Sequence, residues 1–181
     1  MKYIALLRGI NVSGHKIIAM DNLKKWLTSF SGFSNVETYI QSGNIVFTTN
    51  LQTETEMADN IAHIIKQNTQ FEVPVLIITP AYLQEVLNDN PFADLSGFDP
   101  AKMMFTFLNQ TPSPENIENM LQFKHQSNDV LKINGKIIYL YCPDGYGKTK
   151  LNNNLIEQKL KVNATTRNYN TVLKLLAMAA G

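Results

Sequence analysis

Four short polar segments carry the residues whose chemistry could define a function. Arg8 and Asn11 lie in the first segment, and Ser42 and Asn44 lie in the second. An arginine guanidinium presents five donors in a planar fork, which suits phosphate or carboxylate, and nearby glycines let a ligand approach the backbone closely. We therefore treat these four residues, the first loop group, as a candidate anion site. The alternative is that Arg8 caps carbonyl groups and the glycines only form turns.

The other two segments lie in the second half of the chain. A helix is expected from about residue 149 to 160, and the backbone N–H groups at a helix N-terminus attract anions. An arginine in the fourth segment would add positive charge. The alternative is an ordinary solvent-exposed helix start. The second loop group consists of Gly145, Gly147, Lys148, Thr149, Arg167 and Asn168.

The stretch from Cys142 to Thr149 also resembles a P-loop, which requires G-x-x-x-x-G-K-[ST]. Cys142 stands where the first glycine is needed. The strand before it is expected to belong to a hairpin, so the parallel strand–helix–strand setting is missing. The sequence therefore argues against a nucleoside triphosphatase.

Groups for acid–base or nucleophilic catalysis are sparse. His63 is expected inside a helix and His125 in a loop, so only His15 lies near a candidate loop. Cys142 has no histidine beside it in sequence and is expected to be a buried, inert thiol, while Asp144 is typical of a turn. No cluster has metal-ligand spacing. We predict no metal and no cofactor, and whether the protein is an enzyme stays open.

Composition limits the partners and the compartment. Hydrophobic residues make up 44% of the 181 residues, which is enough for a core, and the net charge of +1 gives no general attraction to nucleic acid or membranes. The apolar run at residues 3–7 is too short for a signal peptide, and no stretch approaches the roughly 20 apolar residues of a membrane-spanning helix. With a single cysteine, the chain is expected in the cytoplasm, without a membrane partner.

Hydrophobic spacing predicts the order β-α-β-β-α-β in the first half. The expected strands are residues 3–7, 36–41, 45–49 and 73–78, and the expected helices begin near Met20 and after a Thr53–Glu56 capping box. A short helix from Pro80 follows. Residues 88–101, which contain two prolines and a glycine, are the expected linker.

The second half repeats that order. Its expected strands are residues 103–108, 130–133, 136–141 and 164–167, with Asn134-Gly135 as a hairpin turn. Helices are expected after Ser113, from about 149, and at 170–179. The predicted fold class is α+β, with two tandem ferredoxin-like halves, antiparallel sheets and extra helices, divided into residues 1–79 and 80–181.

The ferredoxin-like topology predicts which loops meet. The end of the first strand and the start of the third lie side by side, which brings the two segments of the first loop group together. In the second half, the third and fourth strands end at the same edge. That brings residues 143–150 close to residues 166–168.

At these loops the chain resembles a bacterial family known as the domain of unknown function number 1697. The resemblance implies an α+β fold with two ferredoxin-like halves, and it implies no activity. Ser13 stands where a glycine is common, which matters only if the loop is left-handed there. The matching stretches are residues 6–12, 38–47, 143–148 and 165–168.

The sequence thus favours binding of a small anionic, phosphorylated ligand at one or both loop groups. The alternative is a non-enzymatic module that binds nucleic acid or protein through a sheet face, as some ferredoxin-like sheets do with exposed aromatic residues. The aromatic run of an RNA-recognition strand is absent, so the tyrosines are expected to fill the sheet faces. The oligomeric state stays open. The tyrosines concerned are Tyr39, Tyr139, Tyr141 and Tyr169.

Overall fold

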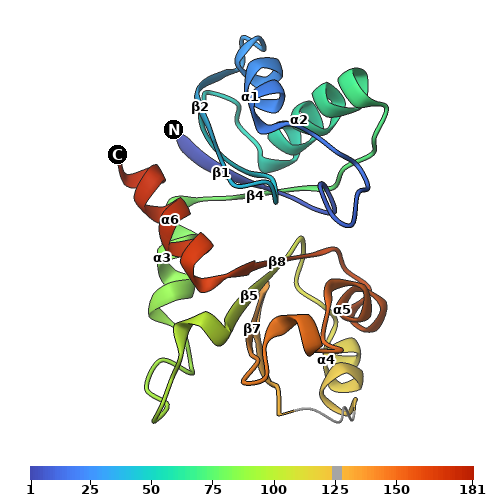
Figure 1. The fold of residues 1–181 in the computed structure, drawn as a ribbon, viewed down its shortest axis with the longest axis vertical. Coiled ribbons are helices and arrows are strands. Elements are labelled where there is room, and N and C mark those ends of the chain that lie inside the picture. The colour runs from blue at the N-terminus through green and yellow to red at the C-terminus, as the bar shows by residue number, and fades with distance from the viewer. Residues whose placement is uncertain (124–127) are drawn as a thin grey trace. The chain divides into compact units, whose positions relative to one another are not determined.

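The computed structural model describes residues 1–123 and 128–181. Within them the chain forms two four-stranded antiparallel sheets and divides into two compact units (Figure 1). Unit 1 comprises Met1–Gln84 and Lys174–Gly181, and unit 2 comprises Glu85–Leu173. None of the helices in the described residues is long and apolar enough to cross a membrane.

Unit 1 has the expected element order. Its sheet runs β2-β3-β1-β4, which is the ferredoxin-like strand order. Because β1 pairs antiparallel with both β3 and β4, it is a central strand, and Arg8 follows its last residue, Leu7. The elements are β1 Lys2–Leu7, α1 Met20–Thr28, β2 Phe33–Tyr39, β3 Asn44–Thr49, α2 Glu54–Thr69 and β4 Val75–Ile78.

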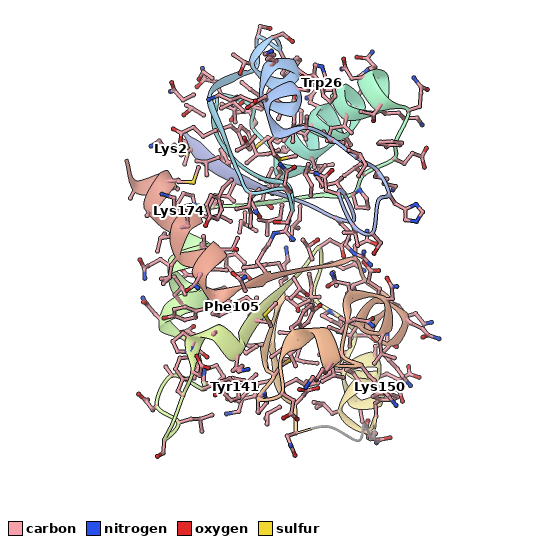
Figure 2. All side chains as sticks on the ribbon, viewed as in Figure 1. Lys2, Trp26, Phe105, Tyr141, Lys150 and Lys174 are labelled. Atoms are coloured by element: carbon pink, nitrogen blue, oxygen red, sulfur yellow. The ribbon has the colours of Figure 1, made fainter. Side chains whose placement is uncertain are left out.

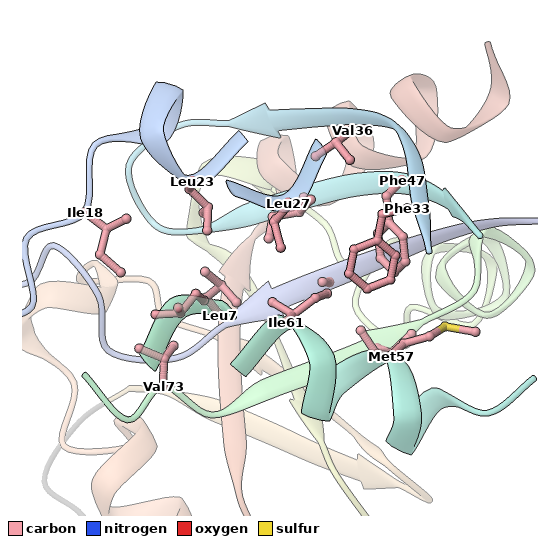
Figure 3. Packing of buried hydrophobic residues seen from close by; sticks show 14 of the residues in the cluster. Leu7, Ile18, Leu23, Leu27, Phe33, Val36, Phe47, Met57, Ile61 and Val73 are labelled. Atoms are coloured by element: carbon pink, nitrogen blue, oxygen red, sulfur yellow. The ribbon is translucent and has the colours of Figure 1, made fainter. Parts of the chain in front are cut away.

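The core of unit 1 lies between its sheet and helices α1 and α2. Leu7 on β1, Leu23 and Leu27 on α1, and Ile61 on α2 are at most 1% exposed and converge in this layer (Figure 3). The period-2 alternation of β1 and the 3.6-residue period of the helices place these side chains on facing surfaces. The Thr53 side chain accepts a hydrogen bond from the Glu56 backbone N–H, as a capping box requires.

Unit 2 repeats the fold. Its sheet runs β6-β7-β5-β8, the same order as in unit 1, so the two tandem ferredoxin-like halves are confirmed. Helix α3, Pro80–Asn88, and helix α6, Tyr169–Ala180, are the extra helices, and each contains a unit boundary. The remaining elements are a 3-10 turn at Pro100–Lys102, β5 Met103–Leu108, α4 Pro114–Leu121, β6 Val130–Asn134, β7 Ile137–Tyr141, a 3-10 turn at Tyr146–Lys148, α5 Asn153–Leu160 and β8 Ala164–Asn168.

Residues 88–101 differ from the expected linker, because most of the segment packs within unit 2. Phe92 is buried and lies 6.1 Å from the ring of Tyr141, and Phe98 stacks on the same ring at 5.7 Å. Phe105 and Tyr141 come from neighbouring strands (Figure 2). The apolar residues of this segment therefore cover the sheet face that α4 and α5 leave open, which is information that prolines and glycines in a sequence do not reveal.

The hairpin turn between β6 and β7 also falls one residue later than expected. Asn134 pairs with Ile137 inside the ladder, so Gly135 and Lys136 form the turn. Gly135 has a φ of 56°, which supplies the positive dihedral angle that such a turn needs.

Candidate functional site

The two segments of the first loop group meet at the end of β1, as the topology predicts. The Leu7 backbone N–H donates to the carbonyl oxygen of Gly43 at 2.8 Å. The Asn11 side-chain amide donates to the carbonyl oxygen of Gln41, also at 2.8 Å. The loop after β1 and the hairpin loop between β2 and β3 therefore form one cluster.

Gly43 is required by close packing at this junction. Its φ is 76°, and a β-carbon on it would lie 2.7 Å from both Leu7 Cβ and Ile10 Cδ1. Real β-carbons do not approach other atoms so closely, and a positive φ is costly for other residues. The glycine therefore lets the hairpin loop rest directly on the end of β1.

Asn11 holds the loop in shape with its whole side-chain amide. Its Oδ1 accepts from the Ile18 backbone N–H at 2.8 Å, and its Nδ2 donates to the carbonyl oxygens of Ile18 and Gln41. Its backbone adopts a left-handed φ of 53°, which asparagine tolerates better than most residues. The structure thus gives Asn11 a bracing role at the site.

Ser42 and Asn44 brace the hairpin loop in the same way. Asn44 is fully buried, and its Nδ2 donates to the carbonyl oxygen of Tyr39 and to Ser42 Oγ, both at 3.0 Å. A buried amide needs such partners because leaving it unsatisfied would cost about 1–3 kcal/mol. Of the first loop group, these residues and Asn11 position the loops.

The loop after β1 folds back in a tight turn. The His15 backbone N–H donates to the carbonyl oxygen of Val12 at 2.9 Å, and Ser13 and Gly14 both have positive φ, 50° and 79°. The base of the turn is fixed by Lys16, whose Nζ donates to the carbonyl oxygen of Glu72. The loop therefore is left-handed at Ser13, the position where a glycine is common in the resembling family.

The backbone that follows Arg8 leaves two donors at this cluster. Arg8 is half-buried, and its own N–H donates to the carbonyl oxygen of Pro74 at 3.0 Å. Gly9 is exposed, and a β-carbon on it would meet nothing within 4 Å. Among the described residues, the backbone N–H groups of Gly9 and Ile10 donate no hydrogen bond to the protein. Residues 8–19 and 38–45 contain no aspartate or glutamate.

The second loop group also gathers at one end of its sheet. Strands β7 and β8 flank β5, where Tyr141 pairs with Met103 and Asn168 pairs with Met104. Both strands therefore end at the start of β5. Thr166 Oγ1 donates to Asn153 Oδ1 at 2.6 Å, which ties β8 to the first residue of α5.

The expected helix N-terminus at Gly147–Thr149 is wrong. Helix α5 begins at Asn153, and the Asn152 side chain caps it by accepting from the Leu155 backbone N–H. Only a three-residue 3-10 turn stands at Tyr146–Lys148, and Thr149 after it is extended. Helix α5 therefore does not begin at this loop, and the resemblance to a P-loop ends there.

Thr149 belongs instead to a partly buried polar cluster. Its Oγ1 donates to Asp129 Oδ2 at 2.6 Å and accepts from the Leu151 backbone N–H at 3.0 Å. Burial raises the pKa of the Cys142 thiol to about 12, and the charge of Asp129 and a hydrogen bond to it act in the same direction. Cys142 is fully buried and free, so the expected burial of its thiol is confirmed. No spacing signal in the sequence points to Asp129.

Arg167 and Asn168 are both engaged within unit 2. Arg167 is 8% exposed, lies beside Phe105 in the ladder and donates from Nη1 to the Thr166 carbonyl oxygen at 2.9 Å. Burial lowers the pKa of Arg167 to about 10, which Tyr146 opposes, so the guanidinium keeps its charge at neutral pH. Asn168 Oδ1 accepts from the Thr171 backbone N–H and caps the start of α6.

The histidines stay apart from any catalytic arrangement. His63 is exposed on α2, His15 is exposed in the turn after β1, and His125 lies outside the described residues. Within residues 1–123 and 128–181, no group of three histidine, cysteine or acidic side chains could hold a metal ion. Gly147 and Lys148 are exposed on the 3-10 turn.

Comparison with known proteins supports the fold and the family. No curated protein matches the chain. A solved structure of a conserved bacterial protein from Streptococcus pneumoniae is similar over 98% of both chains, with a TM-score of 0.73 and 24% identity, which supports a shared fold. The model of the family described as "Protein of unknown function (DUF1697)" matches residues 1–139, which include the first loop group but not residues 143–148 or 165–168. The chain therefore belongs to that family.

Proposed function

We propose that the loop after β1 binds a small anionic, phosphorylated ligand through Arg8 and the N–H groups of Gly9 and Ile10. The observation that carries the proposal is that the Gly9 and Ile10 N–H groups donate no hydrogen bond within the described residues, beside the charge of Arg8, in two segments, 8–19 and 38–45, that contain no acidic residue. Hydrogen bonds to a charged group contribute about 1.5–3 kcal/mol each. Arg8 would provide the charge, and the two backbone donors would orient the bound oxygen atoms.

The other polar residues of the first loop group act as the frame of this site. The Asn11 and Asn44 side-chain amides donate within the two loops, Ser42 Oγ accepts one of these bonds, and Gly43 allows one loop to pack on the other. They would support binding by holding the Arg8 backbone in place, which requires a rigid loop.

The second loop group supports anion binding less well. Thr149 and Asn168 use their side chains within unit 2, and Arg167 is buried. The nearby carboxylate of Asp129 would repel an anion. Gly147 and Lys148 are exposed, and they serve as the comparison site in the experiment below.

A nucleic-acid-binding sheet face is disfavoured by burial. Tyr139 is 2% exposed and Phe105 is fully buried, so neither ring offers a stacking platform. We further propose that the protein acts in the cytoplasm of a bacterium, because its single cysteine is a free, buried thiol. We propose binding only; His15 is the histidine nearest to Arg8 in sequence and the residue to replace first in an activity assay.

Calorimetric titration with inorganic phosphate, sugar phosphates, nucleotides and carboxylates tests the proposal. Wild type is expected to bind a phosphorylated compound, and Arg8→Gln is expected to weaken it at least about tenfold, the equivalent of one lost charge-assisted contact. Lys148→Gln is the matched control and should leave affinity unchanged. Circular dichroism of each variant at the titration temperature confirms folding. Loss of binding in Lys148→Gln with retention in Arg8→Gln would overturn the proposal.

A further inference from the structure

Three exposed aliphatic side chains belong to the same loops as Arg8. Val12, Ile17 and Ile40 are 58%, 62% and 48% exposed. Apart from Met1, they are the exposed large hydrophobic residues of unit 1 within the described part of the chain. Exposed apolar residues are ordinary when scattered, but a cluster of them marks a contact surface.

The hydrogen bonds of Asn11 show that the backbone segments carrying these residues meet. Val12 follows Asn11 directly, and Ile17 precedes Ile18, whose N–H and carbonyl both bond to the Asn11 side chain. Ile40 precedes Gln41, whose carbonyl oxygen accepts from the same amide. One side chain thus joins the three backbone segments that carry the exposed aliphatic residues.

Ile40 has a strained backbone conformation that burial of its side chain does not fully offset. Its φ is 50°, a left-handed value that a β-branched residue rarely adopts. Nearly half of its surface stays in contact with water, so burial in the core offsets the strain only in part. Asparagine or glycine would adopt this backbone conformation with less strain. A strained residue whose side chain stays exposed suggests a role in binding.

The charge of the two segments that carry the aliphatic residues indicates the chemistry of their ligand. Residues 8–19 and 38–45 carry no acidic side chain, and Arg8 lies at the start of the first segment. A complementary ligand would pair an anionic group with an apolar body. The surface of three side chains is much smaller than the roughly 800 Å² that each partner buries in a standard protein interface. The ligand is therefore expected to be a small molecule.

We propose that the ligand of the Arg8 loop is a small anionic amphiphile, a phosphate or carboxylate that carries an aliphatic or aromatic group. This inference rests on the proposed function. Arg8 with the Gly9 and Ile10 N–H groups takes the anionic end, and Val12, Ile17 and Ile40 contact the apolar end.

Calorimetric titration with inorganic phosphate, n-butyl phosphate and n-hexyl phosphate tests this assignment. Each methylene that becomes buried tightens binding by up to about fourfold, so hexyl phosphate should bind at least about threefold more tightly than butyl phosphate. Ile17→Thr and Ile40→Asn should remove this dependence on chain length while inorganic phosphate binds as before. Leu121→Gln, at an equally exposed position of unit 2, is the matched control and should preserve the dependence.

The outcomes separate this inference from the proposed function. Phosphate binding that depends on Arg8 but is independent of chain length would overturn the amphiphile and leave the anion site standing. No binding of any phosphate would overturn both. Sedimentation with vesicles of phosphatidylcholine and phosphatidylglycerol adds a third test. Vesicle binding that requires Ile17 and Ile40, without binding of the soluble alkyl phosphates, would overturn the small ligand in favour of a lipid surface.

Discussion

The Leu7 backbone N–H bonds to the carbonyl oxygen of Gly43 at 2.8 Å, and a β-carbon on Gly43 would lie only 2.7 Å from Leu7 Cβ. This contact fixes the end of β1 against the hairpin loop between β2 and β3. Because Arg8 is the next residue, the same contact fixes where the proposed anion site begins.

Gly43→Ala is therefore expected to destabilise the protein by about 2–4 kcal/mol, from backbone strain and overpacking together. Urea unfolding followed by circular dichroism measures the loss. Gly9→Ala is the control, because Gly9 also has a positive φ, 73°, but open space around its missing β-carbon. It should lose only about 1 kcal/mol. Equal losses in the two variants would contradict the packing role of Gly43.

Two left-handed residues are expected to gain stability when replaced. Ser13→Gly should add about 0.5 kcal/mol and Ile40→Asn about 1 kcal/mol, because each relieves a positive φ. Thermal unfolding measures both. Ser31→Gly, at an exposed turn without a positive φ, should give no gain. Destabilisation by Ser13→Gly would show that the strain is absent.

The buried Cys142 thiol predicts a stability change at high pH. Its pKa rises from an ordinary 9.0 to about 12 in the folded protein, so between these values the unfolded state has lost a proton that the folded state keeps. Stability should fall there by up to about 1.4 kcal/mol per pH unit. The test compares wild type with Cys142→Ala from pH 8.5 to 10.5. The extra slope of wild type should vanish in the variant, and identical slopes would contradict the shift.

Arg167 is expected to be structural. Arg167→Ala should cost more than about 2 kcal/mol, because it removes a long buried side chain and leaves a cavity beside Phe105. Lys148→Ala, at an exposed position, should change stability by less than about 0.5 kcal/mol. If Arg167→Ala lost little stability but no longer bound phosphate, the anion site would have to be assigned to the second loop group instead.

Local patterns in the sequence predict most of the elements, because caps and periodicity are local. Thr53 and Ser113 cap α2 and α4 as their sequence positions suggest. The start of α5 could not be predicted in this way. Thr149 resembles a helix start, but its hydroxyl bonds to Asp129, which lies 20 residues away in sequence.

The candidate site is predictable only as far as topology reaches. Strand order alone brings the loop after β1, which contains Arg8, next to the loop between β2 and β3, which contains Ser42. The roles of Asn11 and Asn44 depend on which carbonyl groups their amides meet, and residue type does not contain that information. The left-handed backbone of Ile40 is likewise invisible in a residue that normally favours strands.

Titration of ¹⁵N-labelled protein with inorganic phosphate, followed by amide chemical shifts, tests the central claim most directly. The proposed site predicts saturable shifts of the Gly9 and Ile10 amides that disappear in Arg8→Gln, while the Gly145 and Gly147 amides stay unchanged. Saturable shifts at Gly145 and Gly147 with none at Gly9 and Ile10 would contradict it.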